Sequence, residues 1–424
     1  MFVGRTSELK FLEECFEKMS PQLIVLYGRD GVGKTSLAKE FVKDKPFRYK
    51  VLNESNFDLS SDVKKGDEVS ERSIIIYDDF EQGIKNNKAF FETLSEDLSK
   101  PYAFVILISS SVNWVENDMV GEIGSLALRI TSFLKLKEFS LMELISRFPK
   151  FSLADCIRTY SVTGGVPSYL DLWNEKQSFK DNVTRLFLCK NSVLKNEANR
   201  ILKNELRELP VYNTILYALA NGMTKLNDIN TFTGYGRAKI SVYIKNLIGL
   251  DIVEKVFSYD TRAAENTKKG VYRIKDFYML FYYRYIFKNR SLIEFEEENI
   301  YDLIIKDSAD DIFKECYKKV CIEYLQLMAE HDRLPLKVEK SGSWYGKKGD
   351  IDYIGADAKG DQVIAFFTWD NEPVGVGAFN MYYELIKEAK ISPSFLYLFA
   401  KEGFSEELKS TVAENVHLVA LEEM

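Results

Sequence analysis

IVLYGRDGVGKTS, residues 24–36, joins an apolar strand pattern to the spacing G-x-x-x-x-G-K-T, and a helical pattern follows it. This chemistry needs glycines, because they let backbone N–H groups close around a β-phosphate. A lysine in the loop neutralises β- and γ-phosphate oxygens, and the next hydroxyl reaches Mg²⁺. The residues that this loop offers to a nucleotide are Gly28, Gly31, Gly33, Lys34, Thr35 and Ser36.

Composition bounds the class of protein. The chain has 424 residues, 46% of them apolar, and a formal net charge of −7. These values predict a globular protein of several domains and argue against a surface dominated by nonspecific attraction to nucleic acid. Five cysteines without a C-x-x-C pair, and two histidines, argue against a disulfide framework or a Cys/His metal centre, so we expect a cytoplasmic protein. No apolar run approaches the ~18 residues that span a bilayer, and we expect no membrane partner.

A second strand pattern, residues 71–77, ends in two carboxylates, Asp78 and Asp79. Because parallel strands end together at one edge of a sheet, we expect Asp78 beside the Mg²⁺ that Thr35 holds, and Asp79 beside the attacking water. Without the phosphate loop, the same pair would read as a solvated turn after a core strand.

A third strand pattern, residues 104–108, is followed by serines at 109–111. Ser110 is the candidate that senses the γ-phosphate at this edge of the sheet. Serines after a strand are also ordinary turn residues, so both interpretations stay open.

Five segments together carry a family resemblance: residues 2–5, the phosphate loop, residues 77–80, the serines at 109–111, and residues 163–170. They resemble the archaeal-type ATPases of the STAND branch of AAA+ proteins. The resemblance implies that Gly4 and Arg5 lie near the adenine and that Pro167 belongs to a turn that closes over the nucleotide from a helical lid. It also implies that Arg129 senses the γ-phosphate, with a surface arginine as the alternative.

One position departs from that family, in which the second of the two carboxylates after the second strand is usually Glu. Here it is Asp79, one methylene shorter. Its reach to a water beside the γ-phosphate is poorer, so we expect slow ATP hydrolysis, with Asp79, Lys34 and Arg129 as the catalytic residues.

The middle of the chain changes to short helical patterns from residue 209 and ends in strand patterns at 252–257 and 270–274. This order is typical of a winged helix-turn-helix. Basic residues on its second helix and in its wing are candidates for double-stranded DNA, and a role as rigid lid or partner surface stays open. They are Arg237, Lys239, Lys245, Arg262, Lys268 and Lys269.

Beyond residue 299 the order helix, strand, strand, helix, strand resembles a restriction-endonuclease-like domain. Asp352 supplies one carboxylate of such a metal site, but Phe366-Phe367-Thr368 stands where Glu-x-Lys is needed. Glu315 and Lys387 are weak substitutes that read better as exposed helix charges. We therefore expect a pseudo-nuclease that serves as a docking platform for a protein partner.

These observations predict an α/β P-loop NTPase sheet with a helical lid, a winged helix and a small α/β domain. The expected ranges are 1–135 for the ATPase core, 136–208 for the lid, 209–298 for the winged helix and its linker helix, and 299–424 for the nuclease-like domain. The predicted function is a switch that binds ATP or ADP with Mg²⁺, hydrolyses ATP slowly and couples nucleotide state to DNA or protein binding. Alternatives are an ATP-regulated, metal-dependent DNA nuclease and a non-enzymatic signalling scaffold.

Overall fold

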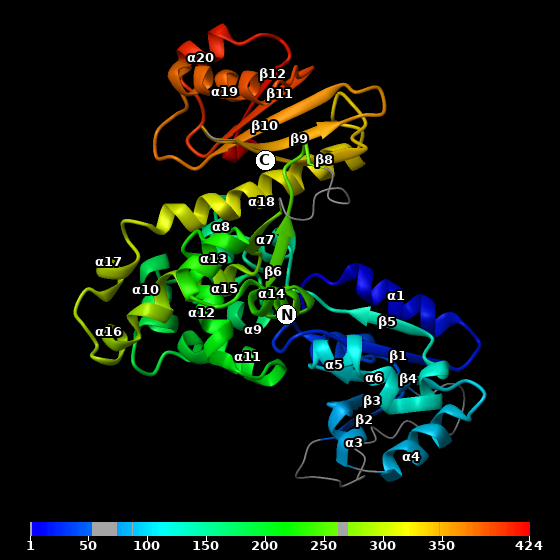
Figure 1. Cartoon of the computed structure of the whole chain (residues 1–424). Helices are drawn as coiled ribbons and strands as arrows, with labels where there is room; N and C mark the ends of the chain where they lie inside the picture. Colours follow the sequence, from blue (N-terminus) through cyan, green and yellow to red (C-terminus); the bar gives the residue numbers. More distant parts are fainter. Residues whose placement is uncertain (1, 53–73, 87, 262–269, 347) are drawn as a thin grey trace. The chain divides into compact units, whose positions relative to one another are not determined.

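The computed structural model describes residues 2–52, 74–86, 88–261, 270–346 and 348–424, and the chain forms two compact units (Figure 1). Unit 1 contains Met1–Arg147, Gly165–Trp173 and Asn196–Leu209. Unit 2 contains Phe148–Gly164, Asn174–Lys195 and Pro210–Met424. Residues of the predicted 136–208 lid therefore fall in both units.

Unit 1 is built on a five-stranded parallel sheet in the order β2-β3-β4-β1-β5. Every residue of the three central strands is buried, which explains their unbroken apolar runs. The strands are β1 (Gln22–Tyr27), β2 (Phe47–Val51), β3 (Ile74–Asp78), β4 (Phe104–Ser109) and β5 (Ser132–Lys135). Its helices are α1 (Thr6–Glu17), α2 (Lys34–Phe41), α3 (Phe80–Asn86), α4 (Lys88–Leu98), α5 (Val112–Asn117), α6 (Met119–Ile123), α7 (Leu141–Arg147), α9 (Pro167–Leu170) and α11 (Glu197–Glu205).

The strand register brings three predicted segments to one edge of this sheet. Tyr27 at the end of β1 pairs with Ser109 at the end of β4, and Asp78 at the end of β3 pairs with Ile108. The phosphate loop, the paired carboxylates and the serines therefore all follow carboxyl ends of neighbouring strands. The predicted P-loop NTPase sheet is confirmed.

Unit 2 begins with short helices and a two-stranded antiparallel sheet. The helices are α8 (Leu153–Thr163), α10 (Phe179–Val183), α12 (Leu209–Ala220), α13 (Leu226–Thr233) and α14 (Arg237–Gly249), and the strands are β6 (Val253–Val256) and β7 (Val271–Ile274). The aromatic run after β7 forms α15 (Phe277–Phe281) and the π-helical turn η5 (Tyr282–Ile286), and most of its rings are buried. No helix in the described part of the chain combines the length and the apolar character that crossing a bilayer requires.

The C-terminal part of unit 2 holds a second five-stranded sheet, in the order β12-β11-β10-β9-β8. Its strands are β8 (Lys340–Tyr345), β9 (Asp350–Ala356), β10 (Gln362–Thr368), β11 (Phe395–Ala400) and β12 (Val416–Ala420). Its helices are α16 (Arg290–Glu294), α17 (Ile300–Ile304), α18 (Ala309–Glu330), α19 (Val376–Ala389) and α20 (Glu406–Thr411). The predicted small α/β domain is confirmed, and the edge strands β8 and β12 are additions to the predicted order.

Candidate nucleotide site

The loop between β1 and α2 has a backbone that requires its glycines. Gly31 has φ +83°, and a Cβ built there would lie 2.3 Å from the Ser168 hydroxyl oxygen. Gly28 lies against the backbone of Leu136, and a Cβ built at Gly28 would lie 2.2 Å from the Leu136 carbonyl oxygen. Gly33 also has a positive φ and directly precedes α2, whose first N–H groups lack helical partners. The loop is therefore shaped as an anion cradle at a helix N-terminus.

Lys34 is the buried cation of this cradle. Its Nζ donates to the carbonyl oxygens of Gly28 at 2.8 Å and Arg29 at 2.9 Å. Burial lowers the pKa of Lys34, although the carboxylates of Asp30 and Asp78 oppose that shift. Both partners are neutral carbonyls, so a phosphate oxygen can replace them with a gain in charge-assisted hydrogen bonding.

Thr35 and Asp78 are in direct contact, as the magnesium prediction requires. The Thr35 hydroxyl donates to Asp78 Oδ2 at 2.8 Å, and Tyr49 donates its hydroxyl to the same oxygen. Hydroxyl and carboxylate oxygens are the ligands that Mg²⁺ prefers. No group of three or more His, Cys, Asp or Glu side chains among the described residues is placed to hold an ion alone, so phosphate oxygens would complete the shell.

Two further carboxyl groups follow Asp78. Asp79 has φ +55°, and burial together with the Asp78 carboxylate raises the pKa of Asp79. Glu81 in the first turn of α3 is only 6% exposed, and burial raises the pKa of its carboxyl group. Among the residues that the structure describes, none forms a hydrogen bond with its Oε2. Sequence reasoning missed Glu81, although its position three residues after Asp78 at a helix start was a usable signal.

A cavity of about 350 Å³ lies over the loop and is lined by polar groups from four segments of unit 1. It gathers most of the predicted site. The lining residues are Asp30, Gly31, Gly33, Lys34, Thr35, Ser36, Asp78, Asp79, Ser110, Pro167, Ser168 and Asp171.

Gly4 and Arg5, the predicted adenine residues, do not line this cavity. Arg5 is buried and donates to the carbonyl oxygens of Val32 at 3.0 Å and Lys137 at 2.5 Å. Gly4 leaves room for Glu143, which accepts a hydrogen bond from the Arg5 backbone N–H. In this arrangement Arg5 supports the phosphate loop from outside the cavity.

Arg129 is not brought to this cavity. Its guanidinium donates to the Leu98 carbonyl oxygen, and the adjoining Thr131 bonds to Leu23 near the amino end of β1. This is the opposite edge of the sheet from the phosphate loop, which corrects the expectation that Arg129 reaches the γ-phosphate.

Arg200 of α11 lies near the phosphate loop instead. Its NH1 contacts Asp30 Oδ2 at 2.6 Å, and its NH2 contacts Glu197 at 2.6 Å. Burial would raise the pKa of Asp30, but hydrogen bonds from Arg200 and Ser110 lower it. The sequence offers no local pattern for this pair, because 170 positions separate the two residues.

The other basic and acidic candidates belong to unit 2. Arg237 and Lys239 are exposed on α14, and the Lys239 ammonium lies over the rings of Tyr235 and Tyr243. The predicted wing residues Arg262, Lys268 and Lys269 lie outside the described residues.

In the C-terminal sheet, a lysine neutralises Asp352, the carboxylate of the predicted metal site. Asp352 Oδ1 contacts Lys318 Nζ at 2.6 Å, and its Oδ2 accepts the Phe367 backbone N–H at 3.0 Å. Lys387 pairs with Glu384 on the exposed face of α19, and Glu315 lies 3.9 Å from Arg284. These two side chains therefore have other partners.

Comparison with known proteins supplies the family. The chain is 30% identical over 377 residues to an uncharacterized protein, MJECL04, of Methanocaldococcus jannaschii, and the match covers 84% of each chain. The chain belongs to the family of that protein. Residues 282–371 also match a family model described as archaea bacterial proteins of unknown function.

Two shorter or weaker likenesses complete the comparison. A stretch of 48 residues is 48% identical to an uncharacterized ATP-binding protein, MJ0423, of the same organism, covering 11% of this chain and 81% of that protein. The Walker-type ATPase PABY2304 of Pyrococcus abyssi aligns over 67% of this chain and 96% of its own, with 17% identity and a TM-score of 0.47.

Proposed function

We propose that unit 1 binds ATP with Mg²⁺, hydrolyses it slowly and uses its nucleotide state to control the binding of DNA or protein by unit 2. One observation carries the proposal. The Thr35 hydroxyl and the Asp78 carboxylate meet at 2.8 Å in the cavity that also contains Lys34 and the glycine loop. The relative that is described as ATP-binding adds support.

Binding would use the loop as it stands. Backbone N–H groups at 31–35 and the Lys34 ammonium would hold the β- and γ-phosphates, while Thr35 and Asp78 would hold Mg²⁺, which neutralises phosphate charge. In exchange for the phosphates, Lys34 would release the carbonyl oxygens of Gly28 and Arg29. Ser110 and Pro167 would close the remaining walls.

Hydrolysis would need a group that orients water, and Asp79 is the carboxylate that lines the cavity. Its short side chain limits its reach to a water beside the γ-phosphate, and burial together with the Asp78 carboxylate raises its pKa. The γ-phosphate charge would compete with Asp30 for Arg200, in the role that sequence analysis gave to Arg129.

Coupling to unit 2 follows from how the chain is threaded. The segments Gly165–Trp173 and Asn196–Leu209 belong to unit 1, and each continues at both ends into unit 2. The first carries Pro167 and Ser168 of the cavity, and the second carries Arg200. A ligand that contacts these segments therefore acts on chain that continues directly into unit 2, and its differential affinity for two arrangements can shift a hinge equilibrium.

The Lys318–Asp352 ion pair argues against the nuclease alternative, because an ammonium group already neutralises the carboxylate that a metal would need. A scaffold role differs from the switch by a single property, the dependence of partner binding on nucleotide. We therefore retain α14 and the C-terminal sheet as candidate output surfaces for DNA or a protein.

Calorimetric titration with a non-hydrolysable ATP analogue tests the proposal. We expect Mg²⁺ to raise the affinity of the wild type about tenfold, and Asp78→Asn to remove that dependence. Asp361→Asn is the matched control, because it makes the same change at an exposed carboxylate that does not line the cavity. Full magnesium dependence in Asp78→Asn, with an unchanged melting temperature, would contradict the proposed site.

A further inference from the structure

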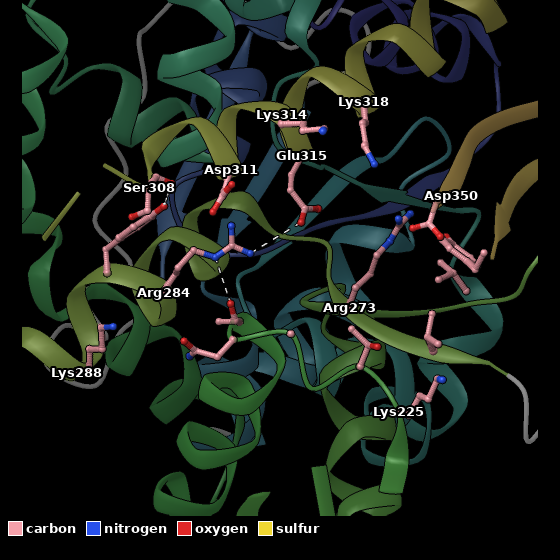
Figure 2. Close-up of a pocket in the computed structure, with 18 of the residues that line it drawn as sticks. Lys225, Arg273, Arg284, Lys288, Ser308, Asp311, Lys314, Glu315, Lys318 and Asp350 are labelled. Atoms are coloured by element: carbon pink, nitrogen blue, oxygen red, sulfur yellow. Dashed lines mark hydrogen bonds and ion pairs between the residues drawn. The ribbon is translucent and has the colours of Figure 1, made fainter. Parts of the chain in front are cut away.

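A second polar cavity, of about 830 Å³, lies within unit 2. It is bounded by the turn after α12, strands β6 and β7, the π-helical turn η5, helix α18, and the ends of β8 and β9. Figure 2 shows Glu315 and Lys318 extending from α18 toward the space between Arg284 and Arg273. Eleven of its nineteen lining residues belong to the segment 282–371 that matches the family model.

The charge of this cavity opposes that of the whole chain. Six of its lining side chains are cationic and three are anionic, whereas the chain carries a net charge of −7. The cations are Lys225, Arg273, Arg284, Lys288, Lys314 and Lys318. An excess of like charge around one hollow is costly unless an anion offsets it.

Three of the cations are held in place by protein groups. Arg284 donates to the Ala220 carbonyl oxygen at 3.2 Å, and Arg273 pairs with Glu254 at 2.6 Å. Burial would lower the pKa of Lys318, but the Asp352 carboxylate outweighs it and keeps the side chain charged. Fixed cations lose little conformational entropy when a ligand binds.

The other three cations, Lys225, Lys288 and Lys314, are exposed, and no carboxylate of the described residues forms an ion pair with them. They come from three different elements and line the same hollow (Figure 2). The protein thus supplies positioned guanidinium groups together with lysines that have charge to give to a ligand. Guanidinium forks and ammonium groups of this kind suit phosphate oxygens.

We propose that this cavity binds phosphate esters, either as a nucleoside polyphosphate or as a stretch of nucleic-acid backbone. Its volume suits a ligand of nucleotide size. Arg273 and Arg284 bind phosphate oxygens in a bidentate manner, and the exposed lysines neutralise the remaining charge. The cavity lies wholly within unit 2, so the inference is independent of nucleotide binding by unit 1.

The test uses the full chain carrying Lys34→Ala, which silences the phosphate loop of unit 1. The probes are ATP, inorganic triphosphate, and a fluorescently labelled 20-nucleotide DNA as single strand and as duplex. The pocket variant is Lys288→Glu with Lys314→Glu. Its matched control is Lys359→Glu with Lys390→Glu, which makes the same charge change at exposed lysines outside the cavity.

We expect at least one probe to bind, with affinity about tenfold weaker in the pocket variant and nearly unchanged in the control. Binding of ATP and triphosphate identifies free polyphosphate as the source of the ligand, whereas binding of DNA alone identifies the backbone. Two results would overturn the inference: no binding of any probe, or equal losses in both double variants, which would indicate nonspecific attraction. Because both pairs of lysines are exposed, we expect both double variants to fold, and melting curves check this.

Discussion

Asp78 and Asp352 are the same side chain on two sheets, and they differ in what neutralises them. Asp78 ends β3 and accepts hydrogen bonds from two hydroxyl groups and one backbone N–H. Asp352 in β9 contacts the Lys318 ammonium and a backbone N–H. Hydroxyl groups leave the negative charge for a divalent cation, whereas an ammonium group removes the need for one. A metal site therefore depends on the partners of a carboxylate as much as on its place in a sheet.

Lys34 and Lys318, the lysines of the same two regions, also differ in their partners. Lys34 is bonded to carbonyl oxygens that a phosphate can replace, so its charge is kept for a ligand. Lys318 is bonded to a carboxylate that is only 11% exposed, so its charge serves the fold. Removing Lys34 should therefore mainly weaken ATP binding, whereas removing Lys318 should mainly lower the free energy of unfolding.

The largest expected effect is on nucleotide affinity. Lys34→Ala should weaken ATP binding about a thousandfold, or about 4 kcal/mol, because a desolvated cation beside the phosphates is lost. Its effect on stability should be small, since burial already penalises the charged lysine. Calorimetry and urea unfolding on the same protein measure both quantities. Retained affinity would make Lys34 a structural residue like Lys318 and remove the contrast.

The second expected effect is on stability. Lys318→Met should cost about 3 kcal/mol of unfolding free energy, because it leaves the Asp352 carboxylate buried without a cation. The double variant Lys318→Met with Asp352→Asn should recover much of that loss. A double-mutant cycle in urea measures the coupling, and additive losses would show that the pair contributes nothing as a pair.

Sequence alone predicted which segments meet at the edge of the sheet wherever local pattern and sheet topology coincide. The glycine spacing, the acidic end of β3 and the serines after β4 each follow a buried apolar strand, and parallel pairing brings those ends together. The same logic predicted the order of helices and strands in the middle of the chain. These features need only short-range signals and one topological rule.

Long-range pairs could not be predicted in this way. Arg129 follows the expected order along the chain, but order does not specify which edge of the sheet its segment reaches. Arg200 and Lys318 read as ordinary helix charges until the fold places Asp30 and Asp352 beside them. The strand β8 was missed because Lys-Ser-Gly-Ser-Trp-Tyr lacks the alternation of a half-buried strand.

A third carboxylate, Asp97, extends the comparison, because three side chains donate hydrogen bonds to it. It is 5% exposed and accepts from Tyr77 at 2.6 Å, Lys100 at 2.7 Å and Arg48 at 3.3 Å. Asp97→Asn should cost about 2 kcal/mol at neutral pH, because charge-assisted hydrogen bonds become neutral ones. Urea unfolding measures the loss, with Asp361→Asn on an exposed turn as the control.

The same variant has a defined pH dependence. Burial would raise the pKa of Asp97, but Lys100 and Tyr77 hold it below its usual value. A carboxyl whose folded pKa is depressed stabilises the protein above its unfolded pKa, about 3.9, and that contribution is lost as the pH falls through the folded value. The difference between wild type and Asp97→Asn should therefore be constant from pH 7 to 5 and shrink below about pH 4. A difference that persists at pH 2 would indicate lost packing instead of lost charge.

The smallest effect concerns hydrolysis and tests whether the Asp78 edge is a working catalytic site. Asp79→Glu should speed single-turnover hydrolysis about tenfold, because the longer side chain brings the carboxylate closer to a water beside the γ-phosphate. Burial and Asp78 raise the pKa of Asp79, so the wild-type rate should increase with pH through that raised value and then level off. Glu81→Gln distinguishes the role of Glu81 from that of Asp79. If Asp79 orients the water, this substitution should change the hydrolysis rate little. A rate that collapses in Glu81→Gln but is unchanged in both Asp79→Glu and Asp79→Asn would assign the catalytic role to Glu81, the buried carboxyl group in the first turn of α3.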